Sequence, residues 1–168
     1  MKVQFLHGTE TGTAEALCED LAKALPASFD VSTASMEDID PQALSSECLN
    51  VFVCSTFGSG DLPTTAIDFY DALTVTRPDL SGRNFAMFGL GDQHFADTFA
   101  QGSERLMQAL QECGAKMTGE RGIFDASSSE LPEDVALPWL AGILGVDLDA
   151  PKPATTGVVS KIGGFFRS

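Results

Sequence analysis

The chain has 168 residues, of which 43% are apolar, and a formal net charge of −14. The apolar fraction excludes a disordered chain and predicts one domain with a single core. The negative charge makes nucleic acid and anionic membranes poor partners. No apolar run reaches the about 18–20 residues of a membrane span, and the N-terminus shows no signal-peptide pattern, so we expect a cytoplasmic protein.

Apolar residues recur along the chain with the alternating periodicities of strands and helices. The nearly continuous apolar run at 49–55 is typical of a buried parallel strand, whereas the stripe of Leu17, Cys18 and Leu21 is typical of an amphipathic helix. Pro138 leaves open whether the last helix begins at Pro132 or at Pro138. Strands are predicted at 2–7, 29–34, 49–55, 84–90 and around 115–124, and helices at 14–25, near 66–73, at 103–113 and within 132–145.

Five strands that alternate with helices predict a three-layer, doubly wound α/β fold, in which helices cover both faces of a parallel sheet. Ligands of such sheets bind beside the carboxyl ends of the strands. Three loops leave those ends, at 8–13, 56–63 and 91–99, and all three contain glycine and few large aliphatic residues. We therefore expect a ligand site where these loops meet.

The loop after the first strand reads GTETGT at 8–13 and leads into a helix at Ala14. Free amides at a helix N-terminus, small residues and hydroxyl groups together predict a phosphate site. Because the loop has no Lys or Arg, the donors would be neutral, and the Glu10 carboxylate should point away. The loop matches neither a Walker loop nor the G-x-G-x-x-G pattern. The alternative interpretation is a threonine-rich helix cap that holds no ligand.

The second and third loops each place one phenylalanine among glycines. Phe57 lies in STFGSGD at 55–61, and Phe95 lies in GLGDQHF at 89–95. Two aromatic side chains at one sheet edge, beside a phosphate site, indicate a flat ring stacked between them, with each contact contributing about 1 kcal/mol beyond area burial. Either phenylalanine alone could instead pack into the core.

Together, TETGTAE, STFGSGD and FGLGD resemble in order and spacing the three FMN-binding loops of the flavodoxin-like family, over about residues 1–145. The pattern is similar to the FMN domains of diflavin reductases, such as cytochrome P450 reductase and sulfite reductase flavoprotein. It is also similar to the short stand-alone MioC-type proteins. The resemblance implies a five-stranded parallel sheet in the order 2-1-3-4-5 and one non-covalently bound FMN.

By motif position, the resemblance implies that the first loop holds the FMN phosphate and that the other two form the walls of the flavin site. The third loop is about one residue longer than is usual in the family, so either Phe95 or Phe99 covers the ring, and Phe95 is favoured. His94 is interpreted as a polar residue at the solvent edge, with a proton relay as the alternative. The implied residues are Thr9, Glu10, Thr11, Gly12 and Thr13 for the phosphate, Thr56, Phe57, Gly58, Ser59 and Gly60 for one wall, and Gly91, Asp92, His94, Phe95 and Phe99 for the other.

The resemblance predicts an electron carrier rather than a self-sufficient enzyme, since 168 residues leave no room for a second lobe that binds FAD or NADPH. A separate NAD(P)H-dependent flavin reductase would supply single electrons, and a P450, a radical enzyme or a biosynthetic enzyme would accept them. We expect a monomer whose acidic body docks on basic faces of both partners. Two alternatives stay open: a small FMN-dependent quinone or nitro reductase, and a flavin-free interaction module on the same fold.

Residues 1–146 are predicted to form the FMN-binding domain, and residues 147–168 a proline-containing linker and tail. The tail is basic, with a charge of +3 over 150–168 against −17 over 1–149, and its apolar residues fall on one helical face. We interpret it as a strap on its own domain or a frayed end. A short anchor for a partner or a membrane surface is the alternative.

The four cysteines, at 18, 48, 54 and 113, show neither a CxxC pair nor a companion histidine at metal-ligand spacing. No zinc or iron–sulfur site is therefore expected. We interpret the cysteines as small apolar side chains of the core.

Overall fold

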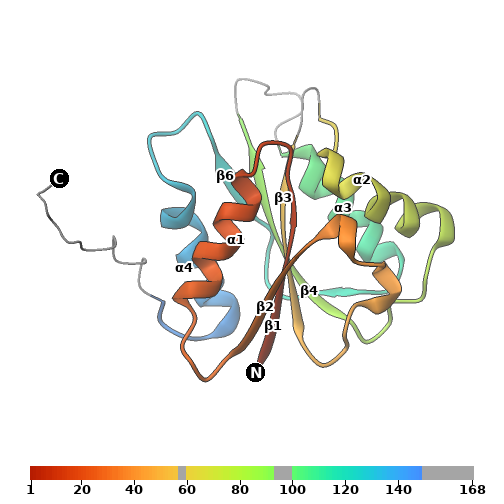
Figure 1. Cartoon of the computed structure of the whole chain (residues 1–168), viewed down its shortest axis with the longest axis horizontal. Coiled ribbons are helices and arrows are strands. Elements are labelled where there is room, and N and C mark those ends of the chain that lie inside the picture. Colours follow the sequence, from red (N-terminus) through yellow and green to blue (C-terminus); the bar gives the residue numbers. More distant parts are fainter. Residues whose placement is uncertain (57–59, 93–99, 149–168) are drawn as a thin grey trace, which may run out of the picture.

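The structure is a computed structural model, and it describes residues 1–56, 60–92 and 100–148. Strands and helices alternate along the chain, and the helices form separate layers on the two sides of one sheet (Figure 1). The strands are β1 (Lys2–Gly8), β2 (Asp30–Ser35), β3 (Leu49–Ser55), β4 (Asn84–Gly91), β5 (Lys116–Met117) and β6 (Gly122–Asp125). The helices are α1 (Thr13–Ala24), α2 (Thr64–Asp71), α3 (Gln101–Glu112) and α4 (Pro132–Leu144), with 3-10 turns at Met36–Asp38 and Pro41–Ala43 and a π-helical turn at Ala72–Thr76.

The sheet is parallel in its described pairings and has the order β2-β1-β3-β4-β5, which confirms the predicted doubly wound fold. The single strand predicted around 115–124 is wrong, because two short strands occupy that edge. β5 pairs with the start of β4 and β6 with its end. Between them the chain turns at Gly119, whose φ of +72° is a left-handed conformation that glycine adopts without strain.

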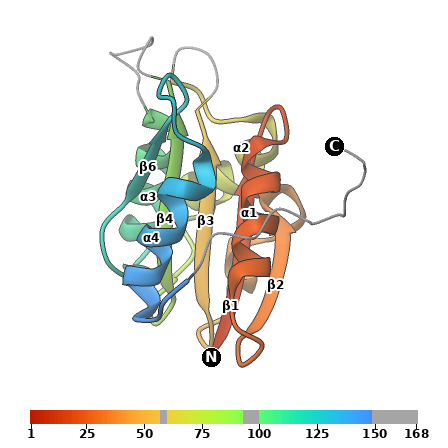
Figure 2. The ribbon, with the colours of Figure 1, turned by 90° about the vertical axis from the view of Figure 1, so that its left-hand side faces the viewer.

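Alternate side chains of the central strands pack into two apolar cores, one on each face of the sheet. On β3, Val51 and Val53 pack in the core that includes α1 and α4, whereas Phe52 and Cys54 pack in the core that includes α2 and α3. Figures 1 and 2 show these two pairs of helices on opposite sides of the sheet. Because helices cover both faces, β3 is apolar along most of its length.

The last helix, α4, begins at Pro132 and contains Pro138, which answers the question that the sequence left open. A proline is tolerated in the first turn because its missing N–H would have no partner there. After Pro138, the Trp139 ring lies 5.1 Å from the Phe88 ring, and its Nε1 donates to the Glu120 carbonyl at 2.9 Å. These contacts hold α4 on the sheet. None of the helices within the described residues is long and apolar enough to cross a bilayer.

Candidate functional site

The carboxyl ends of β1, β3 and β4 lie at one edge of the sheet, at the top of Figure 1, and each leads into one of the three glycine-containing loops. The structure describes the whole first loop, and it describes the second and third loops at their ends, where Gly60, Gly91 and Asp92 lie at this edge. Six predicted site residues lie outside the described residues, and their roles stay predictions. They are Phe57, Gly58, Ser59, His94, Phe95 and Phe99.

The first loop (9–12) leaves the start of α1 open to a ligand. Gly12 stands at the N-cap position with a φ of +93°, and no described side chain caps the helix there. The first amides of α1 consequently have no partner inside the helix. A Cβ added to Gly12 would meet no atom within 4 Å, and the exposed hydroxyls of Thr11 and Thr13 lie 3.5 Å apart. This arrangement fits an anion that is held by neutral donors.

Thr9 stabilises the first loop through hydrogen bonds within the loop and to α2. Its Oγ1 accepts a hydrogen bond from the Gly12 amide at 2.8 Å. Its backbone is joined to α2, because Thr9 N donates to Thr65 Oγ1 at 2.8 Å and Thr65 Oγ1 donates to Thr9 O at 3.1 Å. A hydroxyl that accepts one hydrogen bond can still donate its own proton, so Thr9 keeps a donor for a ligand.

The Glu10 carboxylate turns away from the start of α1, as predicted, and lies against the start of α2. It accepts hydrogen bonds from Thr64 N at 2.8 Å and from Thr64 Oγ1 at 2.8 and 3.0 Å. Pro63 stands at the N-cap position of α2 and cannot cap it, so Glu10 caps this helix from a different loop. The hydrogen bonds from Thr64, the backbone one first, lower the pKa of Glu10 below its usual value.

Thr56 caps α3 as Glu10 caps α2. Ala100 stands at the N-cap position of α3 and offers no polar side chain, and Gly102 N donates to Thr56 Oγ1 at 3.0 Å. Thr56 N in turn donates to Leu90 O at 3.1 Å. A Cβ on Gly102 would lie 2.6 Å from the Ser55 carbonyl oxygen, so this close approach requires glycine. The hydrogen bonds of Thr56 therefore join the start of the second loop to the end of β4 and to the start of α3, which follows the third loop.

Arg121, in the turn between β5 and β6, holds the end of the third loop. Its Nη1 donates to Ala100 O at 3.0 Å and to the buried Ser103 Oγ at 2.8 Å. Ala100 has a φ of +56°, a left-handed conformation that costs a residue with a side chain about 1 kcal/mol. Arg121 was not predicted from the sequence, because no periodic pattern relates it to Ala100, 21 positions away.

Two hollows flank α2, and carboxylates line both of them. The first has a volume of 380 Å³ and is lined by Asp61, Asp71 and Arg105, whose guanidinium lies 5.0 Å from the centre of the Tyr70 ring. The second has a volume of 280 Å³, and its carboxylates belong to Glu37, Asp38, Asp40 and Asp68. Because Glu10 joins the start of α2 to the first loop, this negative surface lies next to the candidate site.

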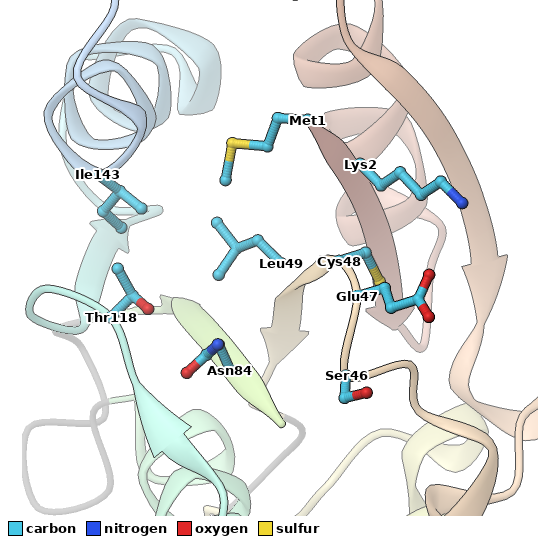
Figure 3. Close-up of a pocket in the computed structure, with 9 residues that line it drawn as sticks. All are labelled: Met1, Lys2, Ser46, Glu47, Cys48, Leu49, Asn84, Thr118 and Ile143. Atoms are coloured by element: carbon cyan, nitrogen blue, oxygen red, sulfur yellow. The ribbon is translucent and has the colours of Figure 1, made fainter. Parts of the chain in front are cut away.

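A third hollow, of 230 Å³, lies at the opposite edge of the sheet, where the amino ends of β1, β3 and β4 meet (Figure 3). Its lining includes the apolar side chains of Met1, Leu49 and Ile143. The Cys48 thiol also lines it and donates to Asn50 Oδ1 at 3.5 Å. The sheet separates this hollow from the three loops, so it is not part of the candidate site.

The cysteines are free thiols with different environments. Cys18 and Cys54 are buried, which confirms their interpretation as core residues, whereas Cys48 and Cys113 are half-buried. Burial raises the pKa of the Cys54 thiol to about 12 and also raises that of Cys18. Within the described ranges, no group of three or more histidine, cysteine or acidic side chains could hold a metal ion.

The chain matches the Flavodoxin family model over residues 6–139. Protein MioC of Escherichia coli strain K12 is 33% identical over 142 residues, which cover 82% of this chain and 92% of MioC. The sulfite reductase (NADPH) flavoprotein alpha-component of Bacillus subtilis is 34% identical over 161 residues, which cover 91% of this chain and 26% of that protein. A mutant of flavodoxin from Pseudomonas aeruginosa has a solved structure similar to this one, with a TM-score of 0.75 at 31% identity, over 86% of this chain and 97% of that chain.

Proposed function

Because the chain belongs to the flavodoxin family, whose cofactor is FMN, we propose that it is an FMN-binding carrier of single electrons. It receives electrons from a separate NAD(P)H-dependent flavin reductase and delivers them to an acceptor redox enzyme. The observation that carries the proposal is the uncapped start of α1 behind a loop without cationic side chains, at the sheet edge where two further glycine-containing loops begin.

The first loop binds the phosphate of FMN in this proposal. The amides at the start of α1 and the hydroxyls of Thr11 and Thr13 donate hydrogen bonds to the phosphate oxygens. Thr9 maintains the turn, and Glu10 contributes its backbone while its carboxylate caps α2. The site thus avoids placing a carboxylate beside a dianion, although Glu10 lies within the loop.

The second and third loops enclose the flavin ring, with Phe57 and Phe95 as the predicted stacking residues. Bound FMN supplies the redox chemistry, and the protein supplies position and electrostatics. Thr56 and Arg121 fix the ends of these loops through hydrogen bonds to the first residues of α3 and to Ala100. Rigid loop ends keep the walls in place between successive electron transfers.

The acidic surface on both sides of α2 supports docking on basic faces of a reductase and an acceptor. Opposite charges steer two proteins together and raise the association rate more than the final affinity. Such a contact weakens as salt rises, because charges that are separated by more than about 8 Å are screened at physiological ionic strength. A carrier that must leave each partner after one transfer benefits from an attraction of this kind.

Absorption spectroscopy and a reconstituted electron-transfer chain test the proposal. We expect the purified protein to be yellow or to become so when FMN is added. We expect electrons from NADPH to reach an acceptor such as cytochrome c only when a separate reductase is present. Turnover of a quinone with NADPH by the protein alone, at about 10 per second, would instead support the quinone or nitro reductase. If the protein takes up no FMN, both flavin-dependent functions would be excluded, and the flavin-free interaction module would be the remaining interpretation.

The role of α2 has its own test, with a matched pair of charge variants. Asp68 and Asp71 are exposed on α2, and Glu19 and Asp20 lie on α1 on the other face of the sheet. We expect D68N/D71N to lower the rate of electron transfer from the reductase at low salt. E19Q/D20N, with the same change in net charge, should leave that rate close to the wild-type value. Equal slowing by both variants would indicate that only total charge matters.

A further inference from the structure

His7, near the end of β1, is buried, and the Nδ1 atom of its side chain lacks a hydrogen-bond partner among the described residues. Its side chain is 8% exposed, and its Nδ1 makes no hydrogen bond with any residue that the structure describes. In the described parts of the chain, no other side-chain nitrogen or oxygen is both buried and unpaired. Leaving such an atom unpaired in the interior costs free energy, so a buried unpaired nitrogen calls for a specific role, such as contact with a ligand.

The position of His7 in the sheet places it under the start of α1. Val3 and Phe5 pack in the core that contains α1, and side chains two residues apart on a strand share a face. Gly8 faces the other side, where a Cβ would meet Ala66 and Met36. His7 therefore lies on the face that α1 covers, at the carboxyl edge, next to the first loop.

Neither the strand residues beside His7 nor the segment that runs from it into α1 carries a positive charge. Its partners in register are Ser35 on β2 and Val53 on β3, which are both uncharged. The sequence contains no Lys or Arg between Lys2 and Lys23. The two helices that pack on this face carry acidic side chains in their first turns, Glu15 on α1 and Glu133 and Asp134 on α4, and the Glu10 carboxylate of the first loop is bonded to Thr64.

We propose that His7 is the cationic positioning residue of the phosphate site: its imidazole takes up a proton when a dianionic phosphate monoester binds to the first loop. The inference rests on the proposed function, in which that loop holds the FMN phosphate. Imidazole is the side chain whose ordinary protonation range lies closest to neutral pH. A phosphate monoester loses its second proton near pH 6, so FMN arrives as a dianion above that pH.

The coupling between the proton and the phosphate has a definite sign. A bound dianion favours the protonated imidazole, and by linkage the protonated imidazole favours the bound dianion to the same extent. The affinity for FMN should therefore rise as the pH falls from about 8.5 to about 7. Riboflavin, which lacks the phosphate, should bind with little dependence on pH in this range.

The experiment compares FMN with riboflavin in the wild-type chain and in His7→Gln, by quenching of flavin fluorescence. Near pH 7, we expect H7Q to bind FMN about tenfold more weakly, which corresponds to about 1.4 kcal/mol, and to bind riboflavin as the wild type does. The pH dependence of FMN binding should disappear in H7Q. Ser35→Ala, at the adjacent position in register, is the matched control and should change neither affinity nor slope.

Proton uptake provides a second measurement that needs no variant at position 7. Calorimetry of FMN binding in buffers of different ionisation enthalpy should show uptake of a fraction of a proton near pH 7.5, with none for riboflavin. Nitrogen-15 spectra of the imidazoles should show His7 becoming protonated when FMN binds. The variant H94Q serves only to assign the signals of the other histidine in the sequence.

The outcomes separate this inference from the proposed function. If H7Q keeps both the preference for FMN and its pH dependence, or if FMN binding takes up no proton, the role of His7 is overturned and the phosphate loop stands. If the wild type binds riboflavin as tightly as FMN, the phosphate loop itself is overturned. If H7Q does not fold, the calorimetry and the spectra of the wild type decide.

Discussion

Replacing Thr56 with valine tests the frame that joins the second and third loops. Valine keeps the shape of threonine but has no hydroxyl, so the Gly102 amide loses the acceptor that lies 3.0 Å away. The loss of a side-chain N-cap costs about 1 kcal/mol, within a range of about 0.5–2 kcal/mol. The amide is partly buried, which places T56V in the upper half of that range. For a domain of this size, each 1 kcal/mol lowers the melting temperature by about 2–4 °C.

Urea unfolding of the flavin-free protein measures this loss, with Thr56→Ser as the control. Serine keeps the hydroxyl, so T56S should retain most of the stability, whereas T56V should unfold at a lower urea concentration with an unchanged slope. Weaker FMN binding by T56V should accompany the loss, because the same bond fixes the start of one predicted wall of the flavin site. If T56V and T56S unfold at the same urea concentration, the hydroxyl does not cap α3 and the reasoning fails.

Three further predictions concern the first loop and the thiols. Because the φ of Gly12 is +93°, Gly12→Ala should lower the free energy of unfolding by about 1 kcal/mol and should also weaken FMN binding. Gly12→Asn should lose less stability, since asparagine tolerates this conformation. Equal losses of stability in urea unfolding would contradict this reasoning. The pKa of Glu10 is lowered in the folded state by Thr64, so its contribution to stability is present above its unfolded pKa and is lost as the pH falls through the folded value. The melting temperature of Glu10→Gln should therefore depend less on pH in the acid range than that of the wild type. Parallel plots of melting temperature against pH for the two proteins would argue against a lowered pKa of Glu10. Burial raises the pKa of the Cys54 thiol to about 12, so this thiol should react only after the protein unfolds. A thiol reagent near pH 8 should therefore modify the half-buried Cys48 first, as mapped by mass spectrometry. Early modification of Cys54 would be inconsistent with its burial.

The parts of the fold that depend on apolar periodicity could be predicted from the sequence. Runs such as 49–55 are apolar because helices cover both faces of the sheet, and the order of the strands follows from the resemblance of the loop motifs. The break between β5 and β6 was missed, although residues 118–122 (TGERG) contain no apolar side chain and Gly119 forms the left-handed turn. Apolar periodicity indicates which residues are buried, but it does not locate where one strand ends and the next begins.

The polar contacts of the candidate site were predicted less completely, for a physical reason. Electrostatic repulsion indicated that Glu10 should turn away from a phosphate, but nothing in the sequence indicated that it would turn toward Thr64, 54 residues away. The same holds for Arg121 and Ala100. A hydrogen bond between a side chain and a distant backbone group depends on how the elements pack, and it leaves no repeating signal along the chain.

The helix caps that the loops exchange also determine how the protein can be recombined with its relatives. Loops are usually the parts of a fold that tolerate replacement. Here the first loop caps α2 and the second loop caps α3, so a transplanted loop without Glu10 or Thr56 would weaken a helix that is not its own continuation. The smallest portable unit is therefore a loop together with the helix start that it caps, and a chimera that keeps both capping pairs within one parent should have its junction after residue 102 rather than at the end of a loop.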